Sequence, residues 1–194
     1  MKAFSQFLFR NRSYTPIPFL LVMFYFQQAT WWSLLIGFAV ALGGELIRLW
    51  GVSYAGSETR TTGPVGGTYL VISGAFSYVR NPLYLGNMMM YVGIGIMSWA
   101  LFPYLQIVAM LFFYYQYYFI IREEEGYLRN TFGEQYERYF KNVPRLFPRL
   151  TSYKDGNVEQ PQYDIKKGLK SETRTLQAFF FVTIILIILF VVNN

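Results

Sequence analysis

Two short stretches of this 194-residue sequence combine side chains that could bind or move charge. The first is Arg80-Asn81-Pro82-Leu83-Tyr84, and the second is Arg122-Glu123-Glu124-Glu125. Asn is favoured at helix N-caps and Pro at the first helical position, so a helix is expected to begin at Asn81–Pro82. Free N–H groups in its first turn would suit a carboxylate or a phosphate. The alternative, weighed equally, is that the first stretch only starts a helix and that Tyr84 is an aromatic residue of the membrane interface.

Three adjacent carboxylates follow a strongly aromatic stretch, at Glu123–Glu125. Neighbouring side chains on a helix point about 100° apart, so one or two of the three can face a pocket. A solvated helix end is the simpler interpretation. However, Glu is unfavourable at the C-terminal end of a helix, which indicates a compensating Arg or a bound cation.

The composition excludes several classes of chemistry. The sequence has no His and no Cys, so it cannot form a disulfide, a Cys/His zinc site, or a Ser-His-Asp or Cys-His catalytic unit. Hydrophobic residues make up 54% and charged residues 14%, against roughly 25% charged in soluble domains. These proportions predict a membrane protein.

Charge-free runs define the expected spans, because a spanning helix needs about 20 apolar residues. The first run, which ends before Glu45, is long enough for helices over about 14–28 and 31–54. The second run, 81–121, is long enough for two more, with a turn at 98–103. A last run covers 175–194. The sequence therefore predicts an all-α bundle of about five transmembrane helices.

Basic residues orient the predicted bundle. All 17 Lys and Arg fall on one side of the five spans, which by the positive-inside rule is the cytoplasm. The N-terminus is then cytoplasmic and the C-terminus outside. The net charge of +6 thus indicates topology and attraction to anionic lipids, not nucleic acid. We expect one multi-pass domain, 1–194, whose cytoplasmic segments 57–80 and 122–170 carry the site.

Three further features concern single elements. A short amphipathic helix is expected over 127–139, after a turn at Gly126. Residues 151–170 have mixed charge without a period and are either a flexible linker or a lid. Glu45 and Arg48 are three residues apart, and we favour an ion pair between them over a role in the site.

Three motifs in this order and spacing resemble the isoprenylcysteine carboxyl methyltransferase family and its prokaryotic relatives, within the wider group of phospholipid methyltransferases. The resemblance covers about 68–148. The motifs are Ser73-Gly74-Ala75-Phe76 with Arg80-Asn81-Pro82-Leu83-Tyr84-Leu85-Gly86, then Glu123–Glu125, then Phe132-Gly133-Glu134 with Val143-Pro144.

The resemblance implies methyl transfer from S-adenosylmethionine to the carboxylate of a prenylcysteine, with S-adenosylhomocysteine as product. The candidate cofactor-binding residues are Thr68, Tyr69, Leu70, Val71, Phe76, Asn81, Pro82, Leu83, Tyr84 and Glu124. The candidate catalytic residues are Arg122 and Glu123. A lipophilic small molecule or prenylated peptide and membrane lipids are the expected partners, and no metal is expected.

The sequence departs from the family pattern at two positions. Asn81 stands where many members have His, and it keeps a hydrogen-bond donor and acceptor. Ile120 stands where the eukaryotic enzyme has a substrate-binding Arg. Arg122 is two residues away, about 200° around the helix. The second departure concerns the methyl acceptor more than the donor.

The absence of His and Cys fits this reaction. A carboxylate acceptor, with a pKa near 4, is ionised at neutral pH and needs no general base. An amine acceptor, with a pKa near 10, must first lose a proton, which assigns a larger role to Glu123, Glu124 or a Tyr. One alternative is therefore a phospholipid amine methyltransferase with the same donor site. A second is a nicotinamide-dependent sterol-type reductase, because such enzymes have C-terminal regions that resemble this chain. The third is a non-enzymatic carrier or assembly protein in which the motifs are only scaffold.

Overall fold

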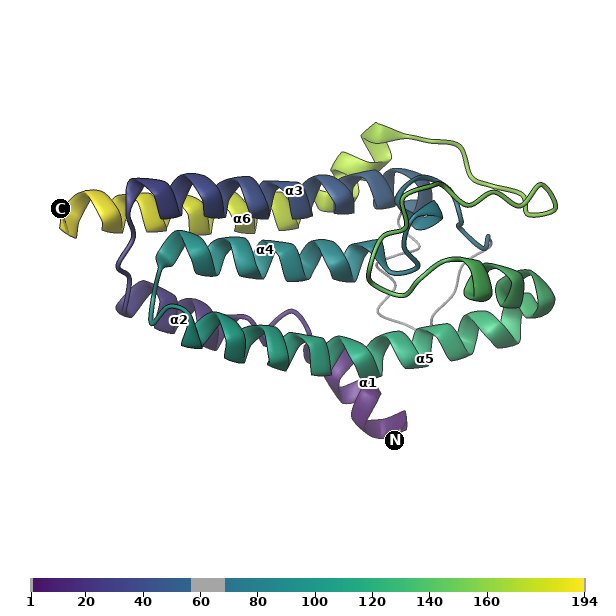
Figure 1. Cartoon of the computed structure of the whole chain (residues 1–194), viewed down its shortest axis with the longest axis horizontal. Helices are drawn as coiled ribbons and strands as arrows, with labels where there is room; N and C mark the ends of the chain where they lie inside the picture. The colour runs from purple at the N-terminus through teal and green to yellow at the C-terminus, as the bar shows by residue number, and fades with distance from the viewer. Residues whose placement is uncertain (1, 57–68, 194) are drawn as a thin grey trace.

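The computed structural model describes residues 2–56 and 69–193 (Figure 1). Within these residues there is no strand, and the predicted all-α class is confirmed for them. The elements are α1 (Lys2–Asn11), α2 (Ile17–Tyr25), α3 (Trp31–Ala55), the short 3-10 helix η2 (Gly74–Ser77), α4 (Pro82–Ser98), α5 (Tyr104–Asn142) and α6 (Ile165–Asn193).

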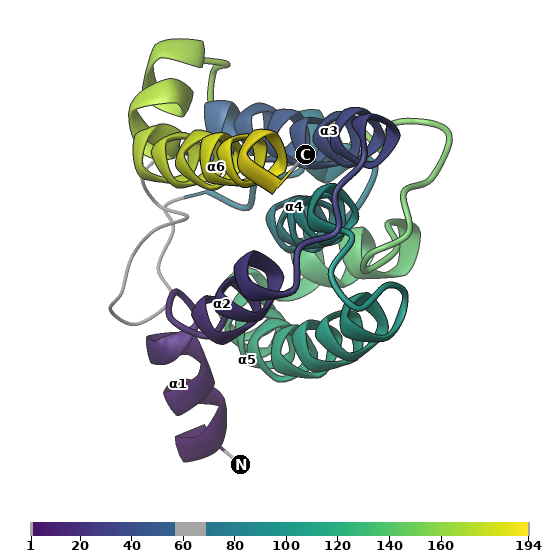
Figure 2. The same cartoon turned by 90° about the vertical axis from the view of Figure 1, so that its left-hand side faces the viewer.

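Helix α4 lies at the centre of the bundle. Figure 2, which looks along the helices, shows α3 and α6 on one side of α4 and α2 and α5 on the other. Glycines allow α3 and α4 to approach closely, because a Cβ atom built on Gly44 would lie 2.5 Å from the carbonyl oxygen of Gly86. One built on Gly37 would lie 2.5 Å from the carbonyl oxygen of Gly93. Small residues at such positions are typical of helix contacts in membranes.

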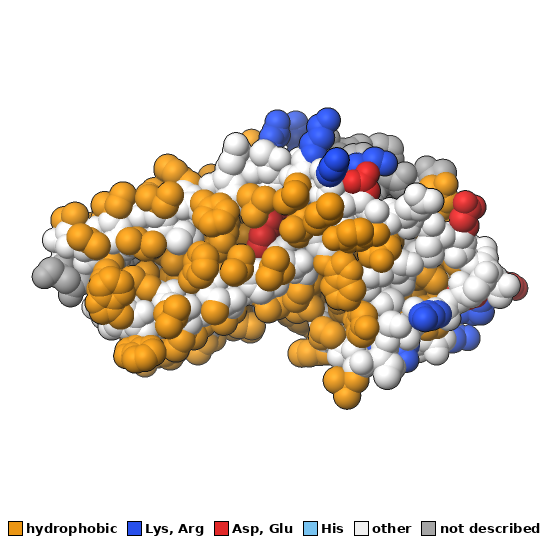
Figure 3. Space-filling model, turned by 90° about the horizontal axis from the view of Figure 1, so that it is seen from above, with side chains coloured by type: hydrophobic (Ala, Val, Ile, Leu, Met, Phe, Trp, Pro, Cys, Tyr) orange, Lys and Arg blue, Asp and Glu red, His pale blue; other side chains and the backbone are white. Residues whose placement is uncertain are grey.

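Among the residues that the structure describes, three helices, α3, α5 and α6, are long and apolar enough to cross a membrane. Helix α4 has 17 residues and extends about 26 Å, slightly less than the hydrocarbon core. The chain is an integral membrane protein with an all-helical bundle, and the number of five spans stays a prediction. Figure 3 shows hydrophobic side chains over most of one face, with Lys and Arg gathered toward one end, called here the basic end.

The first expected helix, over 14–28, is wrong in its bounds. Helix α2 begins at Ile17, after Pro16, and ends at Tyr25. Proline is tolerated in a first helical turn but not inside a helix, so Pro16 and Pro18 prevent an earlier start. Its nine residues extend about 14 Å, which is too short to cross a bilayer alone.

Local signals placed the starts of three helices correctly. Helix α3 begins after Thr30, which exchanges hydrogen bonds with Ser33 in a capping box. Helix α4 begins at Pro82 and helix α5 follows Pro103, as expected. Between them Trp99 has a positive φ of 53° and ends α4 at the predicted turn.

Two expected boundaries nearer the C-terminus are wrong. The short helix expected over 127–139 is wrong in its bounds, because α5 continues through Gly126 and the helix breaks at Gly133, where φ is 50°. Helix α6 starts at Ile165 instead of Thr175. Its first turn is capped by Asp164, whose carboxylate accepts from the backbone N–H groups of Lys166 and Lys167 at 3.0 and 3.1 Å.

A second, smaller core lies at the basic end. It joins the segment after residue 68, the last part of α5 and the connection to α6, through the buried residues Leu70, Ile72, Tyr136, Tyr139, Val143 and Val158. The Gln160 side chain accepts from the N–H of Ile72 at 2.8 Å and donates to the carbonyl of Leu70 at 2.9 Å. The connection, for which the sequence left a linker or a lid open, is packed against the rest of the protein.

Candidate functional site

The two stretches that could bind or move charge, residues 80–84 and 122–125, meet at the basic end of the bundle. Tyr84, in the first turn of α4, donates a hydrogen bond of 2.7 Å to the Oε1 atom of Glu124 on α5. Both side chains are half-buried. Glu124 follows the charge-free stretch that ends at Ile121. Burial raises the pKa of Glu124 to about 7, although the Tyr84 hydrogen bond and the Arg12 charge act in the opposite direction.

Tyrosine hydroxyl groups continue from this pair toward the interior. The ring of Tyr117 lies against that of Tyr84, with centroids 4.7 Å apart. The Tyr117 hydroxyl accepts from the Asn87 side chain at 3.2 Å and donates to the Tyr91 hydroxyl at 3.3 Å. Tyr91 in turn lines two small apolar cavities, one between α4 and α5 and one that α2 also borders. Hydroxyl and amide groups thus extend from Glu124 toward two cavities that are each only about the size of a water molecule.

A buried ionic cluster lies beside Asn87. Arg48 on α3 donates to the carboxylate of Glu172 on α6 at 2.7 and 2.9 Å, and to the side-chain Oδ1 atom of Asn87 at 2.5 Å. Its Nε atom lies 3.5 Å from Glu45, which confirms the predicted ion pair. Glu172 is fully buried, yet its sequence neighbours Lys170 and Arg174 suggested a solvated segment. The only signal for it was a carboxylate at the edge of an apolar run.

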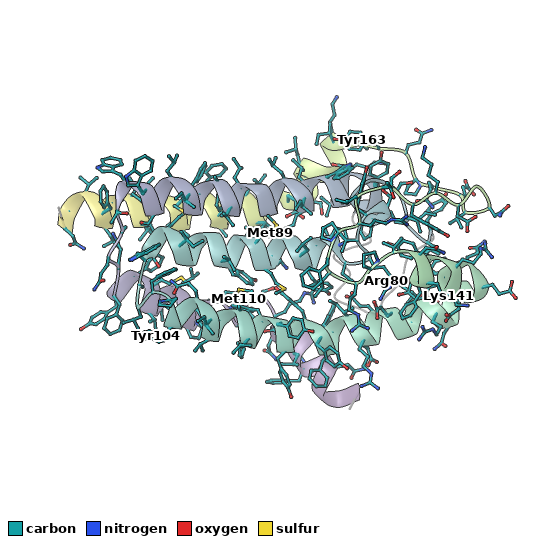
Figure 4. All side chains as sticks on the ribbon, in the orientation of Figure 1. Arg80, Met89, Tyr104, Met110, Lys141 and Tyr163 are labelled. Atoms are coloured by element: carbon teal, nitrogen blue, oxygen red, sulfur yellow. The ribbon has the colours of Figure 1, made fainter. Side chains whose placement is uncertain are left out.

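A second ionic cluster secures the loop that follows α5. Glu125, only 4% exposed, pairs with Arg80 at 3.0 Å and with Arg145. Arg80 also donates to the carbonyl oxygens of Phe140 at 2.8 Å and Val143 at 2.6 Å. In Figure 4, Arg80 lies between the start of α4 and the part of α5 that carries Lys141. These two arginines are the compensating cations that the acidic run indicated.

The remaining residues at the start of α4 face other neighbours. The Asn81 side chain does not cap the helix, contrary to expectation; it donates to the carbonyl oxygen of Arg145 at 3.2 Å. The loop after α5 passes over this helix end, and the hydrogen bond to it turns the Asn81 side chain away from the N–H groups of the first turn. Phe76 and Leu83 lie over Gly51 of α3. A Cβ atom built on Gly51 would be 3.5 Å from the Phe76 side chain and 3.1 Å from the Leu83 side chain. Pro82 is buried.

The other candidate residues are not gathered around Tyr84 and Glu124. Leu70 is buried in the smaller core, while Tyr69 is 38% exposed and Val71 is half-buried. Arg122 is exposed and Glu123 is half-buried, and their catalytic roles stay predictions. Thr68 lies outside the described residues. Across the described part of the chain, no three acidic side chains are grouped as metal ligands would be.

Comparison with known proteins adds two findings. Residues 32–135, from the start of α3 to just beyond the change of direction in α5, match the phospholipid methyltransferase family. The chain is also similar to the cobalt-zinc-cadmium resistance protein CzcN of Cupriavidus metallidurans. The two are 31% identical in an alignment of 163 positions, gaps included, that covers 79% of this chain and 71% of CzcN. No solved structure matches the chain. The region that matches the family, residues 32–135, contains Tyr84 and Glu124 but neither Arg145 nor α6.

Proposed function

We propose a reaction for this chain, which belongs to the phospholipid methyltransferase family and is therefore a membrane methyltransferase. The chain uses S-adenosylmethionine as its methyl donor. The acceptor is the carboxylate of a lipidated, prenylcysteine-like substrate. The reaction takes place at the cytoplasmic membrane face, at the basic end of α4 and α5. The observation that carries this proposal is the contact between Tyr84 and Glu124.

The groups at this contact suit the methyl donor. S-adenosylmethionine supplies a methyl group that its sulfonium already activates. A half-buried carboxylate such as Glu124 can accept hydrogen bonds from the donor's ammonium or ribose hydroxyls, and Tyr84 fixes the carboxylate in place. The N–H groups of Leu83 and Tyr84, in the first turn of α4, have no acceptor within the helix and suit the donor's carboxylate.

The acceptor needs little chemical help if it is a carboxylate. Transfer forms a carbon–oxygen bond as the carbon–sulfur bond breaks, and no proton has to be removed. The protein then contributes proximity, alignment and exclusion of water. Two small cavities that Tyr91 lines between α2, α4 and α5 mark where the acceptor's hydrocarbon chain would enter, with the helices moving apart to admit it.

A phospholipid amine is the second candidate acceptor. Ile120, at the position of the family's substrate Arg, is buried among apolar residues, and Arg122 is exposed. Neither residue favours recognition of a carboxylate. Glu124, with a pKa of about 7, matches the requirement for a general base that removes a proton from an amine near neutral pH.

A lipid methylation assay distinguishes the two acceptors. Membranes that contain the protein are incubated with S-adenosylmethionine labelled in its methyl group, and the lipids are extracted and treated with mild base. Base-labile label indicates an ester and supports the carboxylate acceptor, whereas base-stable label indicates a methylated amine. Lipid labelling no greater than with the Glu124→Gln variant would contradict both.

A further inference from the structure

The loop after α5, residues 144–150, presents two large apolar side chains outward. Phe147 is 86% exposed and Leu150 is 99% exposed. They flank Pro148 and Arg149, and Arg145 precedes them. This loop, called here the Phe147 loop, thus combines fully exposed apolar residues with two arginines at the basic end of a membrane protein.

The exposure does not come from a loosely held loop. The carbonyl of Pro144 accepts from the N–H of Arg80 at 2.9 Å, and the N–H of Arg149 donates to the carbonyl of Tyr78 at 2.9 Å. The Arg149 guanidinium also donates to the carbonyl of Asn142 at 3.0 Å. Both ends of the Phe147 loop are therefore attached to the segment that leads into α4.

The loop lies at the level where the apolar part of α5 ends. Leu146 packs against the buried cluster of α5 that includes Ile120 and Ile121. The Arg145 guanidinium lies 5.7 Å from the ring centre of Tyr118. Figure 1 shows the chain returning from the far end of α5 to the start of α4 before it runs on to α6. Tyrosine and arginine at this height are typical of the interface between membrane and water.

We propose that the Phe147 loop inserts into the surface of the membrane leaflet at the basic end, with anionic lipid headgroups as its partner. Phe147 and Leu150 enter the boundary between headgroups and acyl chains. Arg149 faces the phosphates, and the cluster of Arg80, Arg145 and Glu125 beside it keeps one net positive charge, with the Arg145 side chain 33% exposed, so the charges are complementary. Insertion of the loop does not depend on methyl transfer. It follows from the exposed Phe147 and Leu150, the hydrogen bonds at both ends of the loop, its position where the apolar part of α5 ends, and its positive charge.

Spin labelling tests this directly, because the chain has no cysteine of its own. Phe147→Cys and Leu150→Cys are labelled in vesicles of phosphatidylcholine, with and without phosphatidylglycerol. Glu159→Cys, exposed in the connection to α6, is the aqueous control. Ile187→Cys, on the outer side of the apolar part of α6, is the lipid control. Collisions with oxygen and with a water-soluble nickel chelate report the depth of each label.

At positions 147 and 150, the ratio of oxygen collisions to nickel collisions is expected to be higher than at Glu159→Cys and closer to that at Ile187→Cys. The shift is expected to increase when phosphatidylglycerol is present. If the nickel chelate reaches the labels at 147 and 150 as readily as the label at Glu159→Cys, the proposal is overturned. The exposed apolar side chains would then indicate another partner, such as a protein. Insertion that ignores phosphatidylglycerol would overturn the role assigned to the arginines.

Discussion

Glu123, Glu124 and Glu125 are adjacent in the sequence, yet the fold gives them different surroundings. Glu124 accepts a hydrogen bond from Tyr84, and Glu125 is buried between two arginines. Helix geometry predicted that at most two of the three could face inward. Which of them meets Tyr84 depends on how α4 and α5 pack, and the partner Arg145 lies on a loop that the sequence pattern does not place.

At Glu124, we expect the Glu124→Gln substitution to weaken binding of S-adenosylhomocysteine. A hydrogen bond to a charged group contributes about 1.5–3 kcal/mol, so the loss of affinity should be about tenfold or more. Glu134→Gln removes an exposed carboxylate from the same helix and is the matched control. Calorimetry on the purified variants measures both, and equal affinities would contradict the assigned role.

The ionisation of Glu124 predicts a pH dependence. Because burial raises its pKa to about 7, this side chain becomes protonated as the pH falls through that value. The neutral acid is a weaker partner for the ligand's ammonium group, so affinity for S-adenosylhomocysteine should decrease below pH of about 7 and level off above it. In the Glu124→Gln variant the profile should be flat over this range. A wild-type profile that is also flat would count against Glu124.

At the scale of elements, glycines bring α3 and α4 together. Gly44→Leu would place a side chain against the Gly86 backbone, and overpacking of this kind costs about 1–3 kcal/mol. We expect a clear decrease in the unfolding temperature in detergent. Gly43→Ala is the matched control, because its Cβ would meet only the end of Met89 at 3.6 Å. If both variants unfold at the same temperature, the helices do not pack as described.

The buried cluster around Arg48 connects α3, α4 and α6. Arg48→Met removes the cation that Glu45 and Glu172 share, and breaking a buried ion pair costs about 3–5 kcal/mol. Arg129→Met breaks a pair with Glu137 in which both side chains are exposed, and should cost about 1 kcal/mol or less. Thermal unfolding of the two variants compares these losses. A similar small effect at both positions would show that Arg48 does not hold α6.

Elements were predictable where the signal was local. The Asn81–Pro82 pair lies beside the helix it starts, so the start of α4 was placed correctly. The start of α3 was also correct, and the structure shows that Thr30 caps it. The start of α6 was missed because Lys166, Lys167 and Lys170 resemble a solvated segment. That segment is helical because Asp164 caps it and because Glu172 pairs with Arg48, and the latter contact spans 124 residues of sequence.

At the scale of the whole molecule, composition and charge distribution predicted a helical membrane protein with one basic end. The predicted orientation puts that end in the cytoplasm. In whole bacterial cells whose outer membrane has been removed, an impermeant maleimide should label Asn193→Cys but not Glu159→Cys. Both residues lie outside the buried core, and there is no native cysteine to interfere. The reverse labelling pattern would invert the topology.

The central claim is that this membrane protein binds a methyl donor at the Tyr84–Glu124 contact. Calorimetry on the purified protein in detergent, with S-adenosylhomocysteine and NADPH compared, tests it most directly. We expect S-adenosylhomocysteine to bind, the Glu124→Gln substitution to weaken this binding, and NADPH not to bind. Binding of NADPH alone would instead indicate a reductase, and binding of neither ligand would favour a carrier.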